Sequence, residues 1–117
     1  MNVETFQTHC LAKKGVTEEF PFGETTLVYK VMGKMFALAD LEDFVSINLK
    51  CDPEKSVELR ERYASIIPGY HMNKKHWITV LIDGALPDKF IMGLVDDSYQ
   101  LVVQSLSKSQ KLTLNSL

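Results

Sequence analysis

The chain has 117 residues, a hydrophobic fraction of 45% and a formal net charge of −2 at pH 7. This length and composition are typical of a single domain, here residues 1–117, with one hydrophobic core. Because non-specific affinity for DNA comes mainly from neutralised phosphates, the slight net acidity excludes a strongly cationic nucleic-acid-binding protein. Any such binding requires a local basic patch.

No apolar run reaches the roughly 18 residues that a membrane-spanning helix needs, and the first residues lack the basic and then apolar regions of a signal peptide. We therefore expect a cytoplasmic protein that does not associate with membranes. Cys10 and Cys51 lie far apart without a CxxC motif, so we interpret them as reduced, partly buried thiols.

The first elements are a helix and a loop. Asn2 predicts the N-terminal cap of an amphipathic helix that stops near Gly15. Residues 17–23 contain a proline and a glycine that disfavour regular structure, which predicts an ordered connection. The spacing of Phe20 and Phe22 indicates that both rings anchor this loop on the core.

From residue 25 the apolar period changes to two, which predicts a strand over 25–32. Gly33 then gives a hairpin turn, and further strands follow over 35–39 and, after an acidic turn, over 44–50. The third strand turns alternate residues to the core, namely Val45, Ile47 and Leu49. These three antiparallel strands form a meander.

The second half predicts two helices around a central strand. Asp52, followed by a proline, marks the start of a helix that runs to about residue 65, and Pro68-Gly69 then turns the chain. The near-continuous apolar run 77–82 is typical of a central strand covered on both faces. A last helix is expected over 88–106, and the polar residues 107–117 predict a frayed tail.

The expected order is therefore helix, three strands, helix, one or two strands, helix. Strands that group together with helices outside them favour an α+β fold, a two-layer sandwich of an antiparallel sheet with flanking helices, over a parallel doubly wound sheet.

The stretch 68–77 is the best candidate for a functional site, because it holds two of the three histidines, the single tryptophan and an adjacent lysine pair. No Asp or Glu occurs between Glu61 and Asp83. Lysines and a partly protonated histidine can contact phosphates, an asparagine can hydrogen-bond a base, and an exposed aromatic ring can stack on one. The candidate binding residues are His71, Asn73, Lys74, Lys75, His76 and Trp77, with Lys30, Lys34 and Lys50 completing a basic surface if the Gly33 hairpin lies at the same edge.

A structural interpretation of the same stretch stays open. In it, Trp77 begins a buried strand and anchors the sheet, His71 and Asn73 tie down the turn, and the two lysines are simply solvated.

Catalytic and metal chemistry are weakly supported. His71 and His76 are five residues apart, which places them on no shared helix face, and lysines between them repel a cation, even with Cys51 as a further ligand. His9 and Cys10 are neighbours, and neighbouring side chains on a helix point about 100° apart. We therefore expect no enzyme activity, cofactor or metal. We interpret three acidic pairs as aids to solubility: Glu18-Glu19, Glu42-Asp43 and Asp96-Asp97.

Five segments, taken in order, resemble the MmcQ/YjbR family of small bacterial proteins, and the resemblance extends from about Glu4 to Val103: Glu19–Gly23, Val31–Ala37, Ser46–Pro53, Tyr70–Val80 and Asp83–Asp88. The resemblance implies a CyaY-like (frataxin-like) fold and DNA binding through a double-wing arrangement of β-hairpins, without catalytic residues. The family's hallmark maps to His71, Asn73, Lys74, His76, Trp77 and Thr79. The iron binding of frataxins is not implied, since the first helix offers Glu4 alone against Lys13 and Lys14.

We therefore expect a non-catalytic protein, favoured as a monomer, that binds DNA weakly and in a salt-sensitive way through the turn 74–76 and the Gly33 hairpin. The alternative is a protein- or small-molecule-binding adaptor with a pocket around Trp77, His71 and His76.

Overall fold

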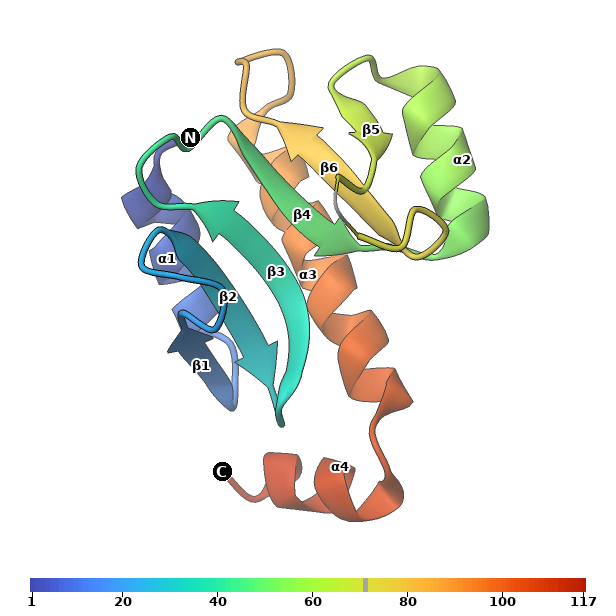
Figure 1. Cartoon of the computed structure of the whole chain (residues 1–117). Coiled ribbons are helices and arrows are strands. Elements are labelled where there is room, and N and C mark those ends of the chain that lie inside the picture. The colour runs from blue at the N-terminus through green and yellow to red at the C-terminus, as the bar shows by residue number, and fades with distance from the viewer. Residues whose placement is uncertain (71) are drawn as a thin grey trace.

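The structure, a computed structural model, describes residues 1–70 and 72–117 (Figure 1). No helix of this part of the chain is both long and apolar enough to cross a membrane. The elements in chain order are α1 (Val3–Leu11), β1 (Val16–Glu19), β2 (Thr26–Val31), β3 (Lys34–Asp40), β4 (Ser46–Lys50), α2 (Pro53–Arg62), β5 (Ile66–Pro68), β6 (Trp77–Leu81), α3 (Asp88–Ser105) and α4 (Lys108–Asn115).

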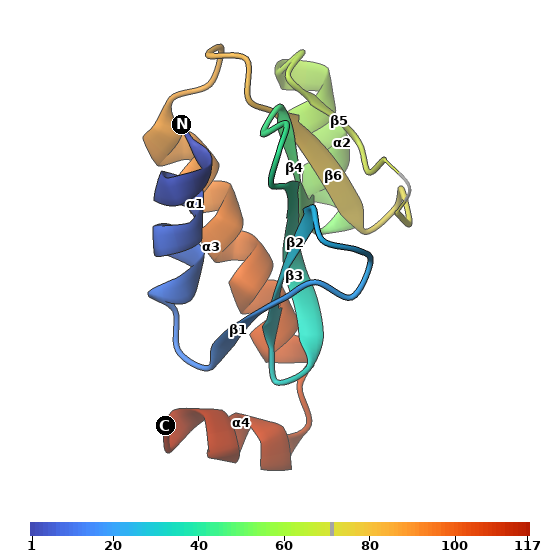
Figure 2. The same ribbon diagram turned by 60° about the vertical axis from the view of Figure 1, so that its left-hand side comes forward.

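The described residues form one antiparallel sheet of six strands in the order β1-β2-β3-β4-β6-β5. β2, β3 and β4 are the predicted meander, and β6 lies between β4 and β5, as predicted for a central strand. Figure 2 shows α1 and α3 on one face of the sheet, while the connections before β2 and before β6 pass over the other face. The expected α+β sandwich is thereby confirmed.

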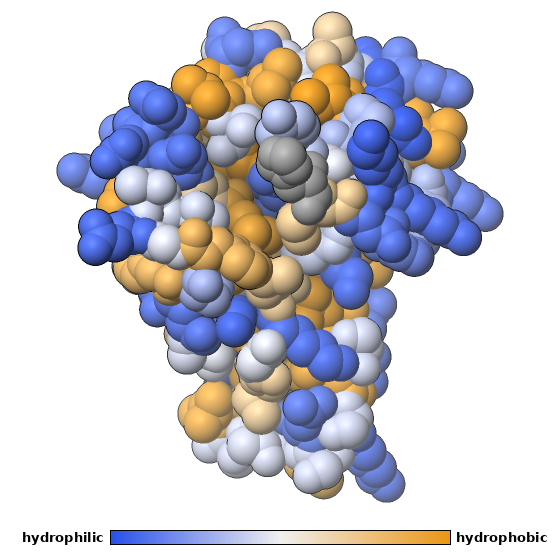
Figure 3. Space-filling view, in the orientation of Figure 1, coloured by the Kyte–Doolittle hydropathy of each residue, from blue (hydrophilic) through white to orange (hydrophobic). Residues whose placement is uncertain are grey.

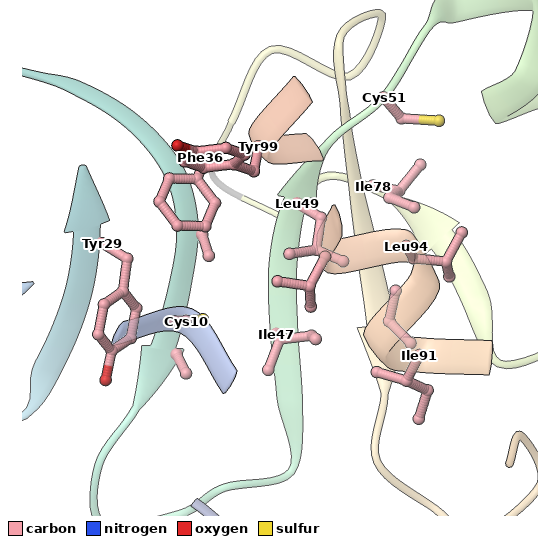
Figure 4. Close-up of a cluster of buried hydrophobic side chains, with 14 of the residues drawn as sticks. Cys10, Tyr29, Phe36, Ile47, Leu49, Cys51, Ile78, Ile91, Leu94 and Tyr99 are labelled. Atoms are coloured by element: carbon pink, nitrogen blue, oxygen red, sulfur yellow. The ribbon is translucent and has the colours of Figure 1, made fainter. Parts of the chain in front are cut away.

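The main hydrophobic core lies between the sheet and the helices α1 and α3. Side chains of alternate strand residues enter it, and Figure 4 shows them meeting residues of α3. The rings of Phe36 and Tyr99 pack edge to face with centroids 5.4 Å apart. Each fully buried large side chain of this kind stabilises the fold by about 1.5–3 kcal/mol. The large core side chains that the central strands contribute are Leu27, Tyr29, Val31, Phe36, Ile47, Leu49, Ile78 and Val80.

A second, smaller cluster packs on the opposite face of the same strands. Val28, Leu38 and Trp77 are buried there, with Met35 and Met72 packed against them. The centre of the sheet is therefore apolar on both faces, and among the described residues the connections before β2 and before β6 pass over its second face.

The predicted hairpin at Gly33 is confirmed. Met32 and Gly33 both have positive φ, 50° and 81°, which is the backbone of the two-residue turn that best matches the twist of paired strands. Lys34 therefore sits directly opposite Val31 at the start of β3.

A bulge follows in the same hairpin. The register shifts between Tyr29 and Lys30, which face Ala37 and Met35 respectively, so Phe36 is the extra residue. Its ring stays in the core, while Met35 returns to the loop-covered face.

Both predicted helix caps are present. Asn2 accepts a hydrogen bond from the Thr5 N–H at 2.8 Å, and Asp52 accepts from the N–H groups of Glu54 and Lys55. These bonds satisfy backbone donors that a helix cannot pair internally.

Several local predictions were wrong. Residues 16–19 and 66–68 form the edge strands β1 and β5, where the sequence predicted a loop and a turn. Phe20 and Phe22 are 44% and 63% exposed instead of anchoring a loop on the core, and Val45 is 65% exposed because β4 begins only after it.

The C-terminal residues also differ from the predicted frayed tail. Ser107 caps α4 through a capping box with Gln110, and Leu114 is buried against the rest of the molecule. Figures 1 and 2 show this helix lying across one end of the two layers.

Candidate functional site

The face of the sheet opposite α1 and α3, which we call the open face, carries side chains in three rows that run across the strands. Successive rows lie about 7 Å apart, because every second residue of a strand faces the same side. The first row is Thr26, Asp40, Ser46 and Leu81; the middle row is Glu19, Val28, Leu38, Asn48, Thr79 and Ile67; the last row is Thr17, Lys30, Met35, Lys50 and Trp77.

The last row contributes to a shallow depression, which we call the basic groove, lined by Pro21, Phe22, Lys30, Gly33, Lys34, Met35, Lys50, Trp77 and Ser105. Three lysines from three strands, Lys30, Lys34 and Lys50, thus meet around Trp77, and no acidic residue is among the described residues that line the groove. The structure therefore brings together all three lysines that the sequence linked to the Gly33 hairpin.

The three lysines differ in how far their charges are already paired. Lys30 forms an ion pair with Glu19 at 3.2 Å, and the Lys34 ammonium donates to the Ser105 carbonyl at 3.4 Å at the end of α3. The Lys50 side chain makes no hydrogen bond or ion pair with the described residues, so its charge is the most available to a ligand.

Lys50 is held in place through its backbone. Its N–H donates to the Ser98 Oγ at 2.8 Å, and the Ser98 hydroxyl donates to the Phe36 carbonyl at 2.6 Å. Ser98, fully buried on α3, therefore replaces a strand-to-strand hydrogen bond just beyond Ala37 and Leu49, where the β3–β4 ladder ends. On its other side Lys50 pairs with Trp77 across the β4–β6 ladder.

The turn 72–76 lies directly before this ladder. The Asn73 carbonyl accepts from the N–H groups of His76 and Trp77 at 3.2 and 3.0 Å, and its side chain accepts from the Lys75 N–H at 2.9 Å. Asn73 thus ties down the turn, as the structural interpretation predicted. Lys74, Lys75 and His76 are exposed and do not line the groove, and His71 lies outside the described residues.

Trp77 is mainly a scaffold residue. Only 8% of it is exposed, because Val28 and Leu38 pack against it. The exposed aromatic rings on this face are instead those of Phe22 and Tyr70, at 63% and 66%.

These two rings border a second hollow, which we call the open-face cleft. Its volume is about 420 Å³, and it is lined by Phe22, Thr26, Leu38, Ala39, Asp40, Ser46, Asn48, Tyr70 and Met72. Figure 3 shows the surface hollowed near the centre of this face, with apolar side chains inside. Phe22 lines both the cleft and the basic groove, so the two hollows adjoin.

Sequence reasoning did not find the cleft. Its residues come from three strands and two loops, so no local motif marks it. One signal was present: Val28 and Leu38 are apolar residues on the strand face that alternation assigns to solvent, which indicates that this face is covered too.

The cysteines are poor nucleophiles. Burial raises the pKa of the Cys10 thiol to about 12 and that of the Cys51 thiol to about 11, so both stay protonated at neutral pH. The His9 ring does not act as a base for the Cys10 thiol, because its Nε2 contacts Asp96 Oδ1 at 2.7 Å. Within residues 1–70 and 72–117, no three His, Cys, Asp or Glu side chains are grouped to hold a metal ion.

The acidic pair Asp96-Asp97 does more than aid solubility, contrary to the interpretation from sequence. Asp96 accepts hydrogen bonds from His9 and Lys13 of the α1 region, and Asp97 pairs with Lys55 of α2 at 2.6 Å. Glu18 is also structural, because its carboxylate accepts from the buried Tyr29 hydroxyl at 2.8 Å.

The fold and the two hollows define a small α+β protein whose antiparallel sheet is covered by helices on one face and carries both hollows on the other. The chain belongs to the YjbR family, whose model matches residues 11–101. This finding confirms the family predicted from the sequence segments.

Similar proteins occur in several bacteria. YbdF of Escherichia coli O157:H7 is 46% identical over 90 residues, which cover 76% of this chain and 74% of that protein. YjbR of Escherichia coli K12 is 34% identical over 112 residues, 95% of each chain. YyaQ of Bacillus subtilis is 36% identical over 75 residues, 64% of this chain and 63% of that protein.

Solved structures share the fold. A crystal structure of the Deinococcus radiodurans protein DR2400, with the domain DUF419, superposes with a TM-score of 0.90 at 40% identity and covers 97% of this chain and 88% of that one. A Pseudomonas syringae protein gives a TM-score of 0.73 at 34% identity, covering 86% and 98%. None of these names states an activity, so the ligand has to be argued from the groove and the cleft.

Proposed function

We propose that this protein binds nucleic acid without catalysing a reaction, and that phosphates lie in the basic groove. The observation that carries the proposal is the convergence of Lys30, Lys34 and Lys50 around a groove whose described lining contains no acid. A cluster of this kind supplies the local positive potential that a chain of net charge −2 needs to attract a polyanion.

The strongest contact is expected at Lys50. Its ammonium has no partner among the described residues, so binding a phosphate there breaks no existing ion pair. At Lys30 a phosphate competes with Glu19, which makes the expected contribution smaller.

Two projections flank Lys50, and together they support the double-wing arrangement. The Gly33 hairpin ends β2 and β3 on one side, and the turn 72–76 precedes β6 on the other. Lys74 and Lys75 are exposed on that turn, so they add charge beside the groove for a ligand that extends past Lys50.

Fluorescence anisotropy with a labelled short DNA duplex tests the proposal at a salt concentration of about 50 mM. We expect Lys34→Ala/Lys50→Ala to weaken binding about tenfold or more, since each charge-assisted contact contributes about 1 kcal/mol or more. Lys74→Ala/Lys75→Ala should weaken it less.

The matched control is Lys108→Ala/Lys111→Ala, which removes the same charge from exposed positions on α4. This variant should bind as the unaltered chain does. An equal loss in both double variants, or no binding of either the duplex or a single strand at low salt, contradicts the proposal.

A second candidate is a small-molecule-binding adaptor. A cavity of about 230 Å³ lies where the end of β4, the start of α2 and α3 meet, lined by Lys50, Cys51, Asp52, Lys55, Ile78, Leu94, Asp97, Gln100, Leu101 and Gln104. It has an apolar floor with a polar rim, the usual character of a ligand site. This place differs from the predicted pocket around Trp77 and His76, which do not line it.

The two candidates predict different thermal shifts. A small metabolite in this cavity should raise the unfolding temperature while DNA does not, because only ligands that bind the folded state stabilise it. Leu101→Trp, at a partly exposed lining position, should fill the cavity and abolish that shift.

A further inference from the structure

The open-face cleft has two exposed aromatic rings at its border. Phe22 is 63% exposed and Tyr70 is 66% exposed, and each lies on a loop that crosses the open face. Large exposed rings that border one hollow are a typical platform for a flat, ring-shaped ligand.

Tyr70 is positioned by a short chain of hydrogen bonds. Its backbone N–H donates to the Thr79 Oγ1 at 2.9 Å, and the Thr79 hydroxyl donates to the side-chain oxygen of Asn48 at 2.5 Å. Thr79 is buried in the middle row, so this chain fixes the start of the 69–76 loop over the sheet.

The floor of the cleft offers hydrogen bonds of both kinds. Because the Asn48 oxygen is engaged by Thr79, its amide N–H groups are left as donors, and they bond no described residue. The hydroxyls of Thr26 and Ser46 and the carboxylate of Asp40 add further donors and acceptors. A mixture of hydrogen-bond donors and acceptors beside the apolar side chain of Leu38 can pair with the edge of a nitrogen heterocycle.

Charge is arranged in one direction along the open face. The lysine row lies about 7 Å from the middle row, and Asp40 lies about 7 Å beyond it on the other side. A ligand in the cleft therefore meets positive charge toward Lys50 and negative charge toward Asp40, while the charge of Lys30 is paired with Glu19. Phe22 borders both hollows, so one molecule can occupy them together.

We infer that the open-face cleft receives an unpaired nucleobase, stacked on Phe22 and Tyr70, whose phosphates lie in the basic groove. The inference rests on the proposed nucleic-acid binding and narrows the ligand to single strands. In a duplex the base is paired and stacked, so it reaches such a cleft only after the cost of unpairing.

Anisotropy with a labelled single-stranded oligonucleotide and with the duplex of the same sequence tests this inference. Phe22→Ala and Tyr70→Ala should each weaken single-strand binding about 5- to 150-fold, the range measured for removing one base-stacking ring. Duplex binding should change little in Tyr70→Ala, because Tyr70 lines the cleft and not the groove. Both rings are exposed, so circular dichroism should show an unchanged fold.

Phe20→Ala is the matched control. Phe20 lies in the same loop and is 44% exposed, yet it lines neither the cleft nor the groove, so its loss should leave binding unchanged. Quenching of the single tryptophan, Trp77, which lines the groove, gives an independent signal without a label.

The possible outcomes separate the two ideas. Equal binding of single strand and duplex, unaffected by Phe22→Ala but weakened by Lys34→Ala/Lys50→Ala, overturns the inference and leaves the proposed function standing. Absence of binding to either nucleic acid at low salt overturns both. Nucleoside monophosphates that compete as tightly as the strand overturn the single-strand assignment in favour of a free nucleotide.

Discussion

Ser98 is the residue on which the geometry of the groove depends most. Its hydroxyl bridges the Phe36 carbonyl and the Lys50 N–H, two backbone groups that lie just beyond the last β3–β4 pair. The residue is fully buried, so water cannot replace these bonds. One side chain on α3 therefore sets the separation of β3 and β4 beneath Lys50.

We predict that Ser98→Ala lowers the free energy of unfolding by about 2–4 kcal/mol, because each buried polar group left unpaired costs about 1–3 kcal/mol. Urea unfolding followed by circular dichroism measures the change. Ser105→Ala on the same helix is the control, since its exposed hydroxyl bonds only the nearby Val102 carbonyl. A loss below about 0.5 kcal/mol in Ser98→Ala, the usual range for surface positions, would contradict the bridging role.

The candidate site was predictable only in part, and the reason lies in single residues. Lys30, Lys34 and Lys50 were foreseen as one basic surface because the hairpin at Gly33 has a clear turn pattern. The nearly complete burial of Trp77 depends on Val28 and Leu38, which are distant in sequence. Exposed rings such as Phe22 look like core residues in a sequence, and nothing local shows that they remain outside.

At the scale of elements, α4 is the clearest case of structure that the sequence conceals. Its leucines are sparse, and one of them alone, Leu114, is buried, at 3% exposure. Leu114 packs where Gly15 leaves room: a Cβ at Gly15 would lie 2.5 Å from the Leu114 Cδ1. A glycine far away in sequence thus permits the docking, which periodicity within 107–117 cannot reveal.

We predict that Leu114→Ala destabilises the protein by about 2 kcal/mol, at the lower end for a buried leucine because the site lies at the end of the molecule. It should also speed proteolytic cleavage in α4, since local opening precedes cleavage. Leu112→Ala, on the same helix but 63% exposed, should change neither quantity measurably. Equal behaviour of the two variants would show that α4 does not dock in solution.

The edge strands β1 and β5 were missed for a related reason. Residues 16–19 carry two adjacent acids, and residues 66–68 end in a proline, so both lack the long alternating pattern that predicts a strand. Proline and charged residues are tolerated there because an edge strand leaves one side of its backbone unpaired. The central strands β2, β4 and β6, which pair on both sides, were predictable.

Asp96 connects two elements through charge. Burial raises the pKa of its carboxyl, but hydrogen bonds from Lys13 and His9 outweigh that effect and hold the pKa below its ordinary value of 3.8. A lowered pKa in the folded state means that the contribution to stability is complete above the unfolded value and disappears as the pH falls through the folded one.

We predict that Asp96→Asn lowers the free energy of unfolding by about 1 kcal/mol near pH 7, a modest effect because the carboxylate is partly exposed and screened. The difference from the unaltered chain should shrink below about pH 4. Urea titrations at both pH values measure it, and Asp43→Asn, at an exposed loop carboxylate, should show no difference at either pH. If the difference in unfolding free energy stayed the same below about pH 4, Asp96 would stabilise the protein through packing rather than through its charge.

For the whole molecule, the distribution of charge matters more than its sum. The chain is slightly acidic, yet three lysines gather at one end of the open face while the acids Asp96 and Asp97 are engaged between helices on the other side. Ions in solution screen such a local potential within about 8 Å at physiological salt. Binding that depends on it must therefore weaken as salt increases.

We predict that the logarithm of the single-strand affinity falls with the logarithm of salt concentration at a slope between about −2 and −3.5, for three to five phosphate contacts at about −0.7 each. Lys34→Ala/Lys50→Ala should reduce the slope by about 1.4, whereas Lys108→Ala/Lys111→Ala should leave it unchanged. Anisotropy titrations over a series of salt concentrations give these slopes directly. Both double variants change the net charge equally. A slope that changes in both would therefore indicate attraction to the molecule as a whole. A slope that changes only in Lys34→Ala/Lys50→Ala locates the phosphates in the basic groove.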